Sequence, residues 1–171
     1  MSNVPESLGA DELRRWSALA QEGLARSRAE IDSLNVFPVP DGDTGTNLFL
    51  TCESAAEAVE KLFATGADAD EGDNRPTRAV VASAFASGAL LGARGNSGVI
   101  TSQILLGFSR ALEVESDTDP SDSEILCRGF DEAVTLAYQA VAQPREGTIL
   151  SVIKAAAEGA RLGARGPDGG A

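Results

Sequence analysis

Two carboxylates are gathered with hydroxyl and amide groups in one short stretch, residues 35–47, with the sequence Asn-Val-Phe-Pro-Val-Pro-Asp-Gly-Asp-Thr-Gly-Thr-Asn. Asp41 and Asp43 are two positions apart, so an extended or turn backbone brings them to roughly 5 Å, where they repel by about 3 kcal/mol at an effective dielectric of about 20. A cation, or the positive end of a following helix, would offset that repulsion. Mg²⁺ usually takes one or two protein carboxylates together with water and phosphate oxygens. The stretch is therefore a candidate site for a metal and a phosphate together.

The residues on either side of this acidic pair favour a stiff loop that leads into a helix. Pro38 and Pro40 fix their own φ and make the residues before them extended. Thr44, Thr46 and Asn47 place side-chain donors at the start of a helix, where free N–H groups and the helix dipole favour phosphate. A phosphate could therefore bind beside the metal.

The same residue types are common in ordinary turns and helix caps, so a solvated turn with a cap is the alternative interpretation. A calcium loop does not fit. Counted from Asp41, the EF-hand positions 5, 6 and 12 fall on Gly45, Thr46 and Cys52, none of which is the residue type that the loop requires.

A second stretch, residues 87–100, contains four glycines just before an apolar segment that predicts a helix from about Ser97 to Leu112. Asn96 or Ser97 is expected to be its N-cap. A glycine-rich turn into a helix can bind phosphate, with Arg94 available to neutralise charge. Close helix packing with a capped turn explains the pattern equally well. A P-loop is excluded, because its lysine and its preceding strand are both missing.

The elements that must position these stretches are all predicted to be helices. Apolar residues recur every three or four positions, and no alternation typical of a β-strand is present. We expect helices at about 10–31, 46–63, 77–90, 97–112, 121–141 and 148–163. The fold class is therefore all-α, with one domain over 10–162, a flexible N-terminal tail at 1–9 and a flexible glycine-rich tail at 163–171.

Composition excludes several classes of function. The net charge of −12 and the lack of a basic run argue against a nucleic-acid partner. No apolar run is long enough for a membrane span and no secretory signal is present, so we expect a cytoplasmic protein. The chain has no histidine, which removes Ser-His-Asp and Cys-His catalysis and His-ligated zinc. Cys52 and Cys127 are expected to be ordinary buried or half-buried thiols.

Three motifs together resemble the DhaL-type nucleotide-binding domain. They are residues 35–47, residues 92–100 with 102–104, and residues 144–150 (Pro-Arg-Glu-Gly-Thr-Ile-Leu). The N-terminal domain of bacterial fatty acid kinases is the most similar, and the dihydroxyacetone kinase L subunit is related. The resemblance covers about residues 10–160 and implies an antiparallel helical barrel with ATP and Mg²⁺ at one rim.

By this resemblance, Asp41 and Asp43 would be Mg²⁺ ligands, and Asn35 would stand where relatives have a third metal-binding residue, often an aspartate. Because Asn35 is a neutral amide, Asp32 is an alternative third ligand. The nucleotide-binding residues implied are Thr44, Thr46 and Asn47 at the phosphates, Asn96 and Ser97 closing over them, and Thr148 beside the nucleotide. No catalytic residue is assigned.

The resemblance also implies a reaction and a partner. In fatty acid kinases the acceptor is a fatty acid held by a separate DegV-like carrier protein, and its carboxylate becomes an acyl phosphate. A dihydroxyacetone kinase L-type subunit and a non-catalytic nucleotide-sensing or partner-binding module are the alternatives. Phosphoryl transfer is mostly positioning and charge neutralisation, so a site without histidine is chemically sufficient for ATP handling.

The chain departs from the fatty acid kinases in two ways: it lacks their further domains, and it stops at Ala171 where the nucleotide domain usually continues into more helices. We therefore expect a C-terminally incomplete barrel that binds Mg-ATP weakly and does not phosphorylate fatty acid alone. Open apolar helix faces would favour a homodimer.

Overall fold

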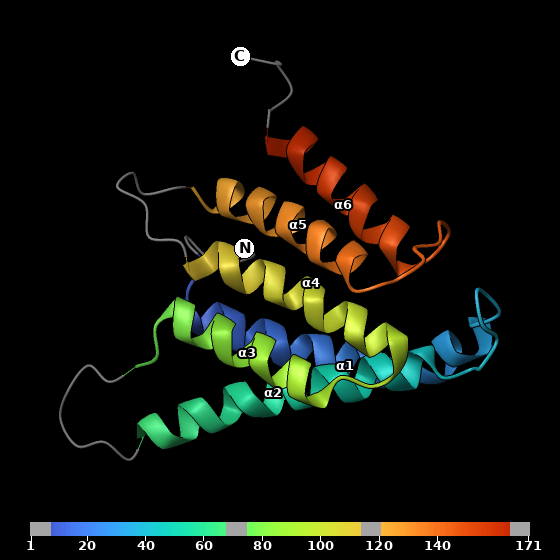
Figure 1. Ribbon diagram of the computed structural model, residues 1–171. Coiled ribbons are helices and arrows are strands. Elements are labelled where there is room, and N and C mark those ends of the chain that lie inside the picture. Colours follow the sequence, from blue (N-terminus) through green and yellow to red (C-terminus); the bar gives the residue numbers. More distant parts are fainter. Residues whose placement is uncertain (1–7, 68–74, 114–120, 165–171) are drawn as a thin grey trace, which may run out of the picture.

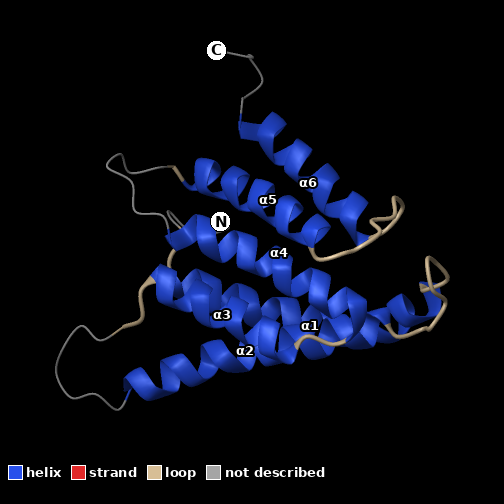
Figure 2. Ribbon diagram, in the orientation of Figure 1, coloured by secondary structure: helices blue, strands red, loops and turns tan. Residues whose placement is uncertain are grey.

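The computed structural model describes residues 8–67, 75–113 and 121–164. Within them the chain forms six helices and no strand, which confirms the predicted all-α class (Figure 2). The helices are α1 (Ala10–Leu34), α2 (Thr44–Ala67), α3 (Arg78–Gly92), α4 (Gly95–Glu113), α5 (Asp122–Gln139) and α6 (Ile149–Ala164). The predicted tails at 1–9 and 163–171 lie mostly outside these residues and stay predictions.

The helices form an antiparallel array in which each packs against the next one along the chain (Figure 1). Helix α2 also packs against α4, and α1 also packs against α3. The first four helices therefore do not lie in a single layer. Within the described residues α6 has one extensive contact, with α5, and none with α1. The array is therefore open between α6 and α1.

Helix α4 is the centre of the packing, because it contributes to all three groups of buried apolar side chains. Leu105 packs with side chains of α2 and α3, Leu112 with side chains of α3 and α5, and Ile100 with side chains of α5 and α6. The helix that follows the second glycine-rich stretch is thus held from both sides, which fixes the position of its first turn.

The antiparallel order places the three motifs at one end of the array. The α1–α2 loop, the α3–α4 turn and the α5–α6 loop all lie at the right-hand end in Figure 1. Each motif contains one of these connections, so the topology brings the three to the same rim, as the resemblance implies.

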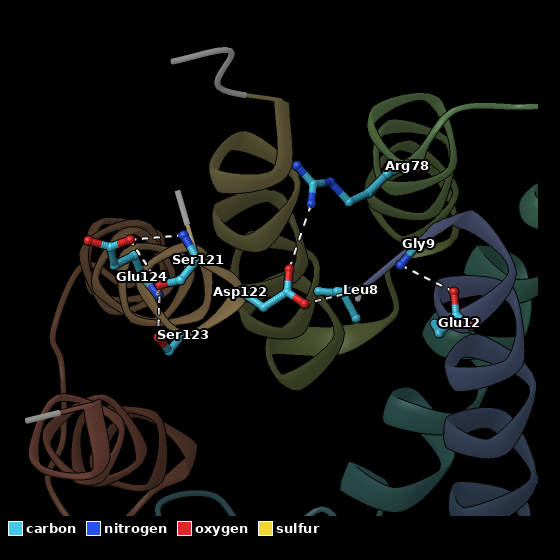
Figure 3. A network of polar contacts seen from close by, with 8 residues as sticks. All are labelled: Leu8, Gly9, Glu12, Arg78, Ser121, Asp122, Ser123 and Glu124. Carbon is cyan, nitrogen blue, oxygen red and sulfur yellow. Dashed lines mark hydrogen bonds and ion pairs between the residues drawn. The ribbon is translucent and has the colours of Figure 1, made fainter. Parts of the chain in front are cut away.

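Polar contacts join helix starts at the opposite end (Figure 3). The carboxylate of Asp122 accepts a hydrogen bond from the Leu8 backbone N at 2.9 Å and lies 3.9 Å from the guanidinium of Arg78. Helix α5 begins with the predicted capping box of Ser121 and Glu124. These contacts tie α1 and α3 to α5 at the end of the array opposite the three motifs.

Helix α4 begins earlier than the sequence predicts, and the expected N-cap at Asn96 or Ser97 is wrong. The Arg94 carbonyl accepts the first helical hydrogen bond, from Gly98 N at 2.9 Å, so both residues lie inside the first turn. Gly95, with φ +57, makes the sharp entry that permits this early start.

Within the described residues, no helix is both long and apolar enough to cross a membrane.

Candidate functional site

The end of α1 caps the start of α2 through two side chains three positions apart. Asp32 accepts hydrogen bonds from Thr46, at 2.9 Å from its backbone N and 2.7 Å from its hydroxyl. Asn35 Oδ1 accepts from the backbone N of Asp43 and of Thr44 and from the Thr44 hydroxyl, at 3.3, 3.2 and 2.7 Å. The free N–H groups of this helix start are thus partly satisfied from a neighbouring helix.

Asn35 also holds the stiff loop. Its Nδ2 donates to the Val39 carbonyl at 2.9 Å, so one amide ties the proline-containing segment to the start of α2. The amide oxygen has two lone pairs and already accepts three donors, which makes Asn35 an organiser of the loop in this structure. Its role as a third metal ligand stays a prediction that requires some of these bonds to open.

Asp32 is likewise committed to α2. Hydrogen bonds from the backbone and the hydroxyl of Thr46 hold the pKa of the Asp32 carboxyl below its ordinary value. Arg28, one turn earlier on α1, donates to the same Thr46 hydroxyl at 2.9 Å and lies over the Phe49 ring at 5.8 Å. The charge of Asp32 is therefore used in a polar chain between the two helices.

Asp41 and Asp43 differ from this pair because both are exposed. Neither carboxylate makes a hydrogen bond or an ion pair with any side chain in the described ranges. Gly42 between them has φ +65, a conformation that only glycine adopts readily. The loop is thus shaped to present two carboxylates to solvent at the start of α2.

The residues present fit a magnesium ion better than a cation enclosed by protein ligands. Across residues 8–67, 75–113 and 121–164, no three acidic, histidine or cysteine side chains are grouped as a metal site. Two free carboxylates match Mg²⁺, which keeps water and takes phosphate oxygens for the rest of its shell. Asp41 and Asp43 are the residues that would hold it.

The second glycine-rich stretch lies directly on the start of α2. A Cβ on Gly95 would be 2.3 Å from Nδ2 of the buried Asn47, so only glycine allows this approach. Thr51 Oγ1 accepts a hydrogen bond from the Arg94 backbone N at 3.2 Å. The structure therefore brings the first two motifs into contact, which the sequence left as two separate stretches.

The first turn of α4 is the next part of the site. No side chain in the described residues caps the N–H groups of Gly95, Asn96 and Ser97. Asn96 and Arg94 are exposed and Ser97 is half-buried. Free N–H groups at a helix start favour an anion, so this turn can contact a phosphate. The close glycine packing considered as the alternative is present at the same place.

The third motif is at the same rim, but its predicted residue bonds locally. The Thr148 hydroxyl donates to the Arg145 carbonyl at 2.8 Å and accepts from Leu150 N at 3.3 Å, so Thr148 caps α6. Glu146 accepts hydrogen bonds from the hydroxyls of Tyr138 and Ser151 and links α5 to α6. No hydrogen bond joins Thr148 to the other two motifs within the described residues.

The two cysteines are free thiols, as predicted. Cys52 is buried, which raises the pKa of its thiol to about 11, and Cys127 is half-buried. Cys52 is therefore unsuited to act as a thiolate.

Comparisons with known proteins match this architecture. The DAK2 domain family matches residues 38–168, which is most of the chain. Uncharacterized proteins of Staphylococcus aureus strains USA300, MRSA252 and N315 are each 45% identical over 139 residues, covering 81% of this chain and 23% of each relative. The chain thus spans less than a quarter of the length of these curated relatives. It belongs to the DAK2-domain family of DhaL-type, kinase-related nucleotide-binding domains, which are related to the dihydroxyacetone kinase L subunit.

Proposed function

We propose that this chain is the Mg-ATP-binding domain of a cytoplasmic kinase that phosphorylates the carboxylate of a fatty acid held by a separate DegV-like protein. The observation that carries the proposal is a pair of exposed carboxylates, Asp41 and Asp43, with no side-chain partner in the described ranges, at a helix start that contacts a second glycine-rich helix start. Carboxylates beside two helix N-termini suit a metal bound to phosphate.

The residues of the chain would act by position and charge. Asp41 and Asp43 would hold a magnesium ion, whose charge would neutralise that of the phosphates. Asp32 and Asn35 keep the first turn of α2 in place beneath them. Asn47 lies against Gly95, and Asn96 and Ser97 follow Gly95 in the first turn of α4; these three residues would orient the phosphates.

The hydroxyls of Thr44 and Thr46 donate to Asn35 and Asp32, respectively. A phosphate contact by either hydroxyl therefore requires one of these hydrogen bonds to open. Thr148 would contact the nucleotide from the third motif while it caps α6.

The acceptor is tested by a reconstituted reaction. The chain is mixed with Mg-ATP and a DegV-like carrier loaded with fatty acid, and acyl phosphate is trapped with hydroxylamine. We expect nucleotide binding without acyl phosphate from this chain alone, and acyl phosphate when a longer relative that contains the same domain replaces it. Phosphorylation of dihydroxyacetone in a parallel reaction with its binding subunit would instead favour the L-type subunit.

Nucleotide binding without any transfer, even in the longer relative, would favour the sensing or partner-binding module.

The apolar side chains exposed on α6, Val152 and Leu162, are consistent with a homodimer. Sedimentation of the chain at several concentrations tests that state directly.

A further inference from the structure

Thr51, in the second turn of α2, is fully buried and touches three parts of the site. Its hydroxyl donates to the Asn47 carbonyl at 2.7 Å and accepts from the Arg94 backbone N at 3.2 Å. A Cβ on Gly98 would lie 2.4 Å from the same oxygen. One hydroxyl therefore contacts the first turn of α2, the residue before α4 and the first turn of α4.

The bond to Arg94 is the part of this arrangement that joins the two motifs. Donation to Asn47 is a local bond of a kind that threonines often make within helices. Arg94 is instead 43 positions away, and its carbonyl opens α4 by accepting from Gly98 N. Thr51 thus fixes the backbone from which α4 begins.

No other hydrogen bond joins α2 to residues 93–98 within the described part of the chain. Close packing adds to this bond: Gly95 lies against Asn47 and, just before this segment, Gly92 lies against the Ser54 side chain. Packing is less directional than a hydrogen bond, so the orientation of the α4 start depends on this hydroxyl.

We propose that Thr51 is a positioning residue for nucleotide binding, because its hydroxyl sets the start of α4 against the start of α2 so that both face the same phosphates. This inference rests on the proposed nucleotide-binding function. Thr51 itself does not touch the nucleotide and acts through Arg94 and the turn that follows it.

The test compares two variants with a control. Thr51→Val keeps the shape but loses the hydroxyl, and Thr51→Ser keeps the hydroxyl. Ser102→Ala is the matched control, because Ser102 is equally buried but its hydroxyl donates to Val99 within α4. In titrations with Mg²⁺ and a non-hydrolysable ATP analogue, we expect Thr51→Val to bind about tenfold more weakly, the scale of one hydrogen bond. Thr51→Ser and Ser102→Ala should bind like the wild type.

Amide hydrogen exchange without nucleotide gives an independent readout. We expect exchange at the amides of Arg94 and Gly98, which donate to Thr51 and to the Arg94 carbonyl, to be about five- to tenfold faster in Thr51→Val only. Unchanged binding by a folded Thr51→Val protein, or an equal loss in Thr51→Ser, would overturn the inference while leaving the proposed function intact. A wild-type protein with protected Arg94 and Gly98 amides that binds no nucleotide would overturn the proposed function, and the inference with it.

Discussion

The carboxylate of Asp32, near the end of α1, accepts two hydrogen bonds from Thr46, in the first turn of α2. The loop between the two helices carries both candidate metal ligands. The contact between Asp32 and Thr46 holds the two ends of that loop together. Asp32 therefore holds the start of α2, while the carboxylates of Asp41 and Asp43 have no side-chain partner among the described residues and would be available to a cation.

We predict that Asp32→Asn destabilises the fold at neutral pH, because the charged acceptor for two Thr46 donors is lost. The folded pKa of Asp32 is lowered, chiefly by the hydrogen bond from the Thr46 backbone N. Its contribution to stability is therefore complete above the ordinary aspartate pKa of about 4 and is lost as the pH falls through the lowered folded pKa.

Urea unfolding of the wild type and Asp32→Asn at about pH 7, 5, 4 and 3.5 measures this effect. The difference in unfolding free energy between the two proteins should be largest at pH 7 and should shrink below about pH 4. An equal difference at every pH would show that the charge of Asp32 is not what stabilises the contact.

Thr148 offers a way to separate capping from nucleotide contact. Thr148→Ala removes the cap of α6 and should cost about 1 kcal/mol of stability. Thr148→Asp keeps a good N-cap residue but places a negative charge beside the expected nucleotide. We predict that Thr148→Asp has near wild-type stability and binds an ATP analogue at least about tenfold more weakly, a loss of about 1.4 kcal/mol.

Thermal unfolding and nucleotide titration on the same Thr148 samples provide the two readouts. Normal nucleotide affinity in the aspartate variant would place the third motif away from the phosphates and leave Thr148 with its capping role alone.

The contact between α4 and α5 depends on a glycine. A Cβ on Gly107 would lie 2.4 Å from the backbone N of Ala133, so Gly107→Ala should push the helices apart and destabilise the protein by about 1–3 kcal/mol. Gly159→Ala is the matched control, because nothing lies within 4 Å of that position on α6. It should stabilise the protein by about 0.5–1 kcal/mol through helix propensity. Denaturant midpoints measure both, and a neutral Gly107→Ala would contradict the close packing.

Much of this fold could be predicted from the sequence because it rests on local signals. The recurrence of apolar residues predicted six helices, and the Ser121 and Glu124 capping box is present as expected. The three motifs that carried the family resemblance lie at one end of the array. An antiparallel order of helices with short links leads to that placement.

What the sequence did not predict depends on contacts between helices. Asp32 was considered only as a metal ligand, although its spacing of three from Asn35 places both on one face of α1, a signal that could have indicated a shared cap. Thr51 is buried on α2, and nothing in the sequence marked it as a contact to the second motif. The cap expected at Asn96 or Ser97 was wrong, because Gly95 at positive φ lets α4 start earlier.

The proposed metal and phosphate site at Asp41 and Asp43 is tested by calorimetric titration with a non-hydrolysable ATP analogue. The wild type, Asp41→Asn, Asp43→Asn and the exposed control Glu57→Gln are each titrated with and without Mg²⁺. We predict magnesium-dependent binding in the wild type and in Glu57→Gln, with at least about tenfold weaker binding, or about 1.4 kcal/mol, in both aspartate variants. Folded aspartate variants that keep full magnesium-dependent affinity, or a folded wild type that does not bind, would contradict it.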